Sequence, residues 1–212
     1  MGMRKSTNIR RREIVEVSLE IIKEHGIQKL SLKRIARRIG ISEQAIYRHF
    51  NSKLEILKAI IVYFNEALRQ SLPPDVFQHS SNETILTLTR AHMAFIQQKP
   101  AVAAVIFSEE MFQNEPELAD MVREALFRRL KHMTQIIEKG QRQGEFHSHL
   151  NPRAVAHLLL GSLRLTVVVW RLEGFPDDLV KRGEEVVKTV LQLISLNVQP
   201  VSGNLINHKP TQ

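Results

Sequence analysis

The residues best suited to chemistry lie between positions 40 and 53, where the sequence reads GISEQAIYRHFNSK. Gln44 and Arg48 carry the amide and guanidinium groups that read base edges in the major groove of DNA. Tyr47 can donate its hydroxyl to a phosphate or lie against a sugar. Because residues three and four apart share one face of a helix, these three side chains would be presented together. The spacing indicates contact with a nucleic acid.

Groups that suit phosphates flank this trio. Ser42 can cap the helix, whose N-terminus attracts anions, and Lys53 can hold a second phosphate. Glu43 is unexpected on a surface that faces DNA, and two interpretations stay open. It accepts from a cytosine, or it only complements the helix dipole.

The excess positive charge of the chain is concentrated near these residues. Residues 1–53 hold 13 Lys and Arg against 5 Asp and Glu, whereas residues 54–212 hold 17 of each. A basic segment joined to a neutral remainder is typical of a protein that binds a polyanion. The alternative is a basic tail that only aids solubility, but such a tail would not carry the apolar period of helices.

Three short helices are predicted to position the trio. One covers residues 8–25, and a second is capped by Ser31 and stopped by Gly40. The third runs from 42 to 50, about eight residues or roughly 12 Å, about the width of the major groove. The second and third helices, joined by Gly40-Ile41-Ser42, fit a helix-turn-helix unit.

Longer helices follow, beginning with one that Ser52 and Glu55 open as a capping box and that runs to about residue 71. The others are predicted over 80–99, 101–113, 114–144, 152–173 and 177–196. The fold class is therefore all-α, with about nine helices. We expect a DNA-binding domain at 1–52, a helical effector-binding and dimerisation domain at 53–198, and a disordered tail at 199–212.

The run from Ser31 to Leu57 resembles the DNA-binding signature of the TetR family of transcriptional regulators. The positions that match are Ser31, Ile35, Ala36, Gly40, Ser42, Tyr47, Phe50, Lys53 and Leu57. Gln44 departs from the pattern, since members often carry glycine there, and its side chain is expected to alter base preference. The signature covers about 50 residues, and the remainder is similar to the family in size, helicity and helix order only.

This resemblance implies a homodimer that represses from palindromic double-stranded operator DNA and is released by a small effector. A minority of such proteins activate, or act as chromosome-associated factors. The residues expected at the DNA are Ser31, Ser42, Glu43, Gln44, Ala45, Tyr47, Arg48, His49 and Lys53. The helices at 152–173 and 177–196 are the expected dimer interface, with Gly183 permitting close approach. The alternative is that the apolar face of the last helix packs only within one subunit.

A ligand pocket is expected among large apolar side chains of the middle helices, because methionine and aromatic residues suit adaptable cavities. Its candidates are Phe64, His92, Met93, Phe95, Phe107, Met111, Phe112, Met133, Arg164 and Trp170. The set predicts an apolar or amphipathic effector, although Glu109-Glu110 would instead suit a cationic one. For two candidates an ordinary role is favoured. His92 is expected at a core position bonded to a backbone carbonyl, and Arg164 in a stripe with His157 and Arg171 that faces solvent or pairs with acidic groups across the dimer.

Other functions find little support in the sequence. There is no cysteine, and His147-Ser-His149 is a weak metal signal, so no metal or cofactor is predicted. No motif of a phosphate-binding loop, zinc protease or serine hydrolase is present, which argues against an enzyme. Residues 1–13 hold no apolar run of the kind found in signal peptides, so none is expected, and the most apolar stretch, 154–172, is interrupted by charges. A cytoplasmic protein with no membrane partner is expected, with an architectural or cell-division factor as the second hypothesis.

Overall fold

A computed structural model describes residues 6–108 and 113–196. Within these ranges the chain is helical, which confirms the all-α prediction. The described helices are α1 (Thr7–His25), the 3-10 turn η1 (Ile27–Lys29), α2 (Leu32–Ile39), α3 (Glu43–Tyr47), α4 (Lys53–Gln70), α5 (Ser81–Gln98), α6 (Ala101–Ile106), α8 (Pro116–Arg142), α9 (Pro152–Leu172) and α10 (Leu179–Ile194).

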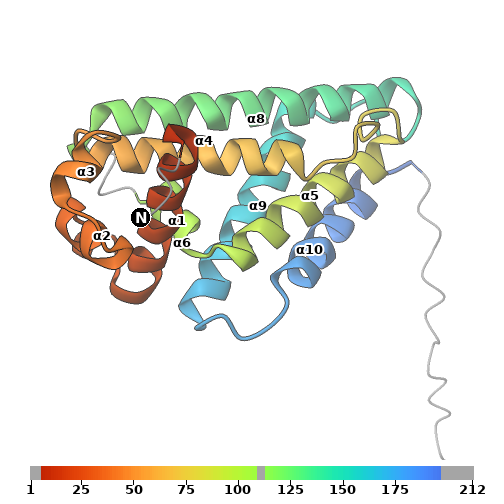
Figure 1. The fold of residues 1–212 in the computed structure, drawn as a ribbon. Helices are drawn as coiled ribbons and strands as arrows, with labels where there is room; N and C mark the ends of the chain where they lie inside the picture. The colour runs from red at the N-terminus through yellow and green to blue at the C-terminus, as the bar shows by residue number, and fades with distance from the viewer. Residues whose placement is uncertain (1–5, 109–112, 197–212) are drawn as a thin grey trace, which may run out of the picture.

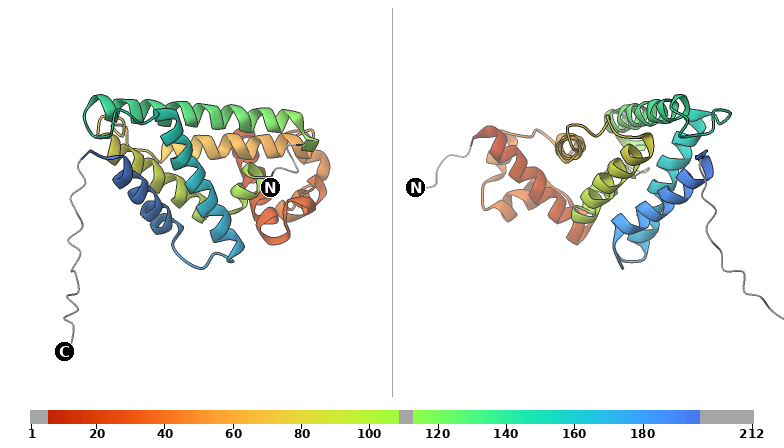
Figure 2. Two further views of the ribbon diagram at one scale, coloured as in Figure 1. Left: turned by 180° about the vertical axis from the view of Figure 1, so that it is seen from behind. Right: turned by 90° about the vertical axis from the view of Figure 1, so that its right-hand side faces the viewer.

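The helices form a head at one end and a body that extends from it. The head consists of α1, α2 and α3, and the body of the helices from α4 onward (Figure 1). Helices α4 and α8 contact each other and run side by side along the length of the molecule. At the end away from the head, α5, α9 and α10 pack together beneath α8 (Figure 2).

Side chains that the sequence identified as caps begin these helices. The Oγ atoms of Ser31, Ser42 and Ser52 each accept from a backbone N–H three residues on, at 3.2 Å. Gly40 adopts φ of +79° and ends α2 in the left-handed conformation that favours glycine. Glu55 reaches the backbone N–H of Asn51 at 2.8 Å, one residue before the partner of an ordinary capping box.

Several predicted boundaries are wrong. Helix α3 has five residues rather than about eight, because the chain turns at 48–49 before Phe50 enters the core. Helix α6 ends at Ile106 rather than at residue 113. Helix α10 begins at Leu179, after the cap Asp178, rather than at residue 177. The predicted tail at 199–212 lies outside the described residues.

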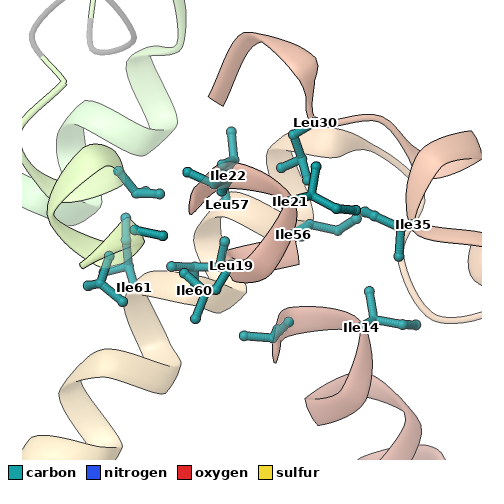
Figure 3. Close-up of a cluster of buried hydrophobic side chains, with 14 of the residues drawn as sticks. Ile14, Leu19, Ile21, Ile22, Leu30, Ile35, Ile56, Leu57, Ile60 and Ile61 are labelled. Carbon is teal, nitrogen blue, oxygen red and sulfur yellow. The ribbon is translucent and has the colours of Figure 1, made fainter. Parts of the chain in front are cut away.

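One cluster of buried side chains joins the head to the body. Ile14 and Ile35 of the head have no exposed surface, and neither do Ile56 and Ile60 of α4 (Figure 3). The same cluster continues to Val102 of α6 and to the first turns of α8. The core therefore crosses residue 52, and the boundary between domains at that position stays a prediction.

A second cluster holds α5, α8, α9 and α10 together. Gly183 of α10 lies against Met93 of α5 so closely that a Cβ there would be 2.6 Å from the Met93 Cγ. The close approach predicted for Gly183 therefore occurs within the subunit. Val187 and Leu191 are buried on the same side of α10, whereas Leu193 is 75% exposed on the other.

The end of the body away from the head is closed by the segment after α8. Phe146 is buried against Gly140, and the Glu145 carboxylate accepts from the backbone N–H groups of Ser81 and Asn82 at 2.8 and 3.1 Å. The N–H of His147 donates to the carbonyl of Ile194 at 2.9 Å. This segment therefore fixes the start of α5 and the end of α10 to α8.

Among the described helices, α9 alone is long and apolar enough to cross a membrane by length and composition, with a mean hydropathy of 1.5 over 18 residues. One face of α9 packs against α8 and α10 through Val155, Leu159, Leu163 and Val167. Its apolar length thus contributes to the packed body.

Candidate nucleic-acid interface and ligand site

Helix α3 packs on the core of the head with one face, and its opposite face is exposed to solvent. Ile46 and Phe50 are fully buried. The backbone N–H groups of His49 and Phe50 both donate to the Ile46 carbonyl, at 2.8 and 3.0 Å, and tighten the turn after the helix. Gln44, Tyr47 and Arg48 are all exposed, Tyr47 by 51%. The predicted trio therefore lies together on the surface of the head.

A side chain from α1 fixes the end of α3. The Arg11 guanidinium lies 4.1 Å from the centroid of the Phe50 ring and donates to the backbone carbonyl of His49. His49 is half-buried behind α3, and burial together with the charges of Arg10, Arg11 and Arg48 lowers its pKa. A neutral His49 ring packed against the head suits support of α3 better than contact with a phosphate.

The basic face of α2 is partly committed to other groups. Lys33, Arg34 and Arg37 are exposed, whereas Arg38 forms an ion pair with Glu24 of α1. Lys53, at the start of α4, is half-buried, and burial lowers its pKa.

The remaining predicted DNA residues surround α3. Ser31 and Ser42 are exposed at the starts of α2 and α3. Glu43 and Ala45 are half-buried on the flank of α3. The nine residues predicted at the DNA thus lie on or beside the two helices of the helix-turn-helix unit.

Part of the predicted ligand set comes together between α4 and α5. The Phe64 ring lies 5.5 Å from the His92 ring and 5.2 Å from the Phe95 ring, centroid to centroid. His92 has no hydrogen-bond partner among the described residues, so the predicted carbonyl bond is wrong. Burial, and then the charge of Arg129, lower the pKa of His92 to about 3.

Arg164 of α9 points inward rather than along a solvent-facing stripe. Its guanidinium lies 5.1 Å from the centroid of the Phe107 ring. His157 is exposed and bonds the carbonyl of Arg153 at 2.8 Å. The two side chains therefore differ in exposure, and the role of Arg164 stays a prediction.

The other predicted ligand residues lie elsewhere. Met93 and Met133 are buried in the second cluster. Trp170 donates from Nε1 to the carbonyl of Asp177 at 2.9 Å and holds the turn between α9 and α10. Met111 and Phe112 lie outside the described residues. Two surface hollows of about 440 and 860 Å³ open away from this set, beside Phe77 and between α1 and α4.

Sequence reasoning missed Arg129 of α8, which lies against the same aromatic cluster. Its Nη2 donates to Oδ1 of Asn65 at 3.0 Å, and its guanidinium lies 4.6 Å from the centroid of the Phe64 ring. Burial lowers its pKa to about 10. The signal was available, because Arg129 falls in helical register between the inward-facing Ala125 and Met133.

Two family models match the chain. Residues 14–60 match the model described as bacterial regulatory proteins, tetR family. Residues 45–194, more than half of the chain, match the model described as YsiA-like protein, C-terminal region.

Individual relatives are similar over most of their length. The chain is 23% identical over 190 residues to a probable acrEF/envCD operon repressor of Escherichia coli, covering 86% of each protein. It is 28% identical over 167 residues to the nucleoid occlusion factor SlmA of Vibrio atlanticus, covering 76% of this chain and 83% of that one. The crystal structure of the transcriptional regulator FadR from Bacillus subtilis with stearoyl-CoA matches with a TM-score of 0.73 at 21% identity, covering 85% and 97% of the chains.

Proposed function

The chain belongs to the TetR family of bacterial transcriptional regulators, and we propose that it is a repressor that binds a palindromic operator as a homodimer and is released by a small amphipathic effector. The observation that supports the DNA-reading part is the exposed face of α3. Gln44 and Arg48 offer base-reading donors there, and Tyr47 a phosphate donor, above a core that fixes the helix. We expect the protein to act in the cytoplasm, where its DNA is.

Exposed apolar side chains on α9 and α10 support the homodimer. Leu158, Leu165 and Leu172, spaced by seven residues along α9, are 63%, 63% and 82% exposed. Leu193 of α10 and Leu196, just beyond the end of that helix, are 75% and 48% exposed. Contiguous exposed apolar surface of this kind marks interaction sites. The pair of helices would pack on its copy as a four-helix bundle, and the partner-facing residues would be these rather than the inward face around Gly183.

The effector part is supported by the aromatic cluster between α4 and α5. Phe64, His92 and Phe95 combine apolar surface with a polar ring, which suits an amphipathic molecule. The FadR structure, similar in fold, was solved with stearoyl-CoA. A ligand that displaces α4 would move the head, because α4 and the head share one buried core.

Selection from a random duplex library by the purified full-length protein, at about 0.15 M salt, tests the proposal. A palindrome with half-sites about one helical turn apart is expected. Enrichment of unrelated sequences, or none, from a folded dimer would contradict a sequence-specific repressor. Sedimentation of Leu165→Glu, with the same substitution at exposed Leu126 of α8 as the matched control, tests the interface. Only the first variant should dissociate to monomers.

A DNA-bound cell-division factor is the second candidate, favoured by the similarity to a nucleoid occlusion factor. The same selection separates the two functions. Sites beside promoters support repression, whereas sites spread over the chromosome away from promoters support the second candidate.

A further inference from the structure

Among the residues that the structure describes, Arg129 carries a positive charge into the body without a counter-ion. It contacts the Asn65 amide and the Phe64 ring, both on α4. Within residues 6–108 and 113–196, no carboxylate forms an ion pair with it. The adjacent Arg128 behaves differently, because it is exposed and pairs with Glu124 at 3.6 Å. The sequence therefore places one paired and one unpaired arginine side by side.

Burying an unpaired guanidinium costs free energy unless an anion pairs with it. Buried charges in proteins are ordinarily paired or fully hydrogen-bonded. The guanidinium has five N–H donors in a planar fork that matches a carboxylate or phosphate. The Asn65 oxygen uses one of them. The others have no partner among the described residues.

The polar groups around Arg129 are only partly closed off by protein. Arg129, Asn65 and His92 each keep part of their surface accessible to water. They nevertheless lie at the junction of the two buried clusters, and burial shifts the pKa values of Arg129 and His92. The rings of Phe64 and Phe95, whose centroids lie 5.2 Å apart, supply apolar surface beside these polar groups.

We propose that Arg129 binds the oxyanion head, a carboxylate or phosphate, of an effector whose apolar part lies against Phe64 and Phe95. This inference rests on the proposed function, since it names the chemical class of the effector. Asn65 adds an amide beside the anion. The neutral His92 ring adds polar contact without a competing charge.

The same geometry supplies the link to DNA. Arg129 belongs to α8, whereas its two contacts, Asn65 and Phe64, belong to α4. An oxyanion that takes the guanidinium donors competes with the Asn65 oxygen and loosens this contact between α8 and α4. Because α4 shares a core with the head, its shift is transmitted to α3.

Calorimetric titration of the full-length protein tests the inference with three probes that share a twelve-carbon chain. Dodecanoate carries a carboxylate, dodecanoyl-CoA carries phosphates, and dodecan-1-ol carries neither. Binding of either anion, with the alcohol at least tenfold weaker, is expected. Whichever anion binds identifies the source of the oxyanion. Equal binding of the alcohol, or no binding of any probe, overturns the inference.

Variants at the two adjacent arginines give the matched comparison. Arg129→Met should weaken binding of the anion by about tenfold to a hundredfold, as for loss of a charge-assisted hydrogen bond, and Arg129→Lys should weaken it less. Arg128→Met should leave it unchanged. Because Arg129→Met removes an unpaired charge, the ligand-free variant should melt no lower than the wild type. A lower melting temperature, or equal losses at both positions, overturns the inference.

Failure of this inference is distinguishable from failure of the proposed function. Operator selection does not depend on Arg129. A palindrome recovered by a protein that binds neither anion overturns only the effector class. Anion binding that depends on Arg129, without any operator, contradicts only the repressor.

Discussion

Replacing Gly140 by alanine is expected to destabilise the protein, although alanine is the better helix former. A Cβ at Gly140 would lie 2.3 and 2.4 Å from two carbons of the Phe146 ring and 3.0 Å from the Ser81 Cβ. Phe146 is only 1% exposed, so its ring has no free space to enter. Carbon atoms in contact need about 3.5 Å. Either the ring must move by about 1 Å, or α8 must separate from the segment that follows it.

Two effects of opposite sign determine the free energy of unfolding. Alanine gains about 1 kcal/mol of helix propensity over glycine. Overpacking a filled site costs about 1–3 kcal/mol, and a displacement of about 1 Å belongs at or above the upper end. We expect a net loss of about 2 kcal/mol, which lowers the Tm by about 4–8 °C for a chain of this length.

Denaturant titration followed by circular dichroism measures this loss at one fixed protein concentration, because association makes stability depend on concentration. Phe146→Ala alone should cost about 3–5 kcal/mol. The double variant should cost no more than Phe146→Ala, because the clashing ring is gone. A Gly140→Ala protein as stable as the wild type, or strictly additive losses, would refute the close packing of α8 on Phe146.

Three further predictions concern the head and the interior. Lys53→Ala should weaken binding to every DNA sequence and reduce the slope of log affinity against log salt by about one. Tyr47→Phe should weaken binding to specific and to non-specific duplexes by the same factor. Fluorescence anisotropy at several salt concentrations measures the affinity of both variants. Gln44→Gly should instead change which bases are enriched in the duplex selection, and an unchanged consensus would remove its base-reading role. The pKa of His92 is lowered to about 3, so stability is lost as pH falls from about 6.5 towards 3, where only the unfolded chain takes up the proton. In the wild type, His92 should contribute a slope of unfolding free energy against pH of at most about 1.4 kcal/mol per pH unit between pH 6 and 4.5. His92→Gln should lack this contribution. An identical slope for both proteins in denaturant titrations would contradict the burial of the ring.

Local signals in the sequence predicted the helices well. Ser31, Ser42 and Ser52 cap helices as expected, because a short hydroxyl side chain satisfies the first N–H groups whatever the tertiary context. The buried pair Ile46 and Phe50 was also predictable, since four-residue spacing determines which side of the turn they share.

The tertiary contacts of a residue were harder to predict. The sequence does not distinguish packing of Gly183 on Met93 from packing on a second subunit, because either contact needs a small residue on the same helix. Arg164 and His157 share a seven-residue spacing, but only the packing of α9 against its neighbours decides that Arg164 turns inward to Phe107. Arg129 was missed because a charged residue is ordinarily assigned to the surface, although its position falls in register with the buried residues of α8.

The core that runs from Ile14 and Ile35 through Ile56 and Ile60 has a consequence for exchanging DNA specificity between relatives. A chimera joined at residue 52 would pair a foreign head with side chains of α4 and α6 that did not evolve to fill it. Grafting only the exposed residues of α3 onto this chain would leave those contacts intact. The reading surface is thus transferable as a set of side chains, whereas the head is not transferable as a module.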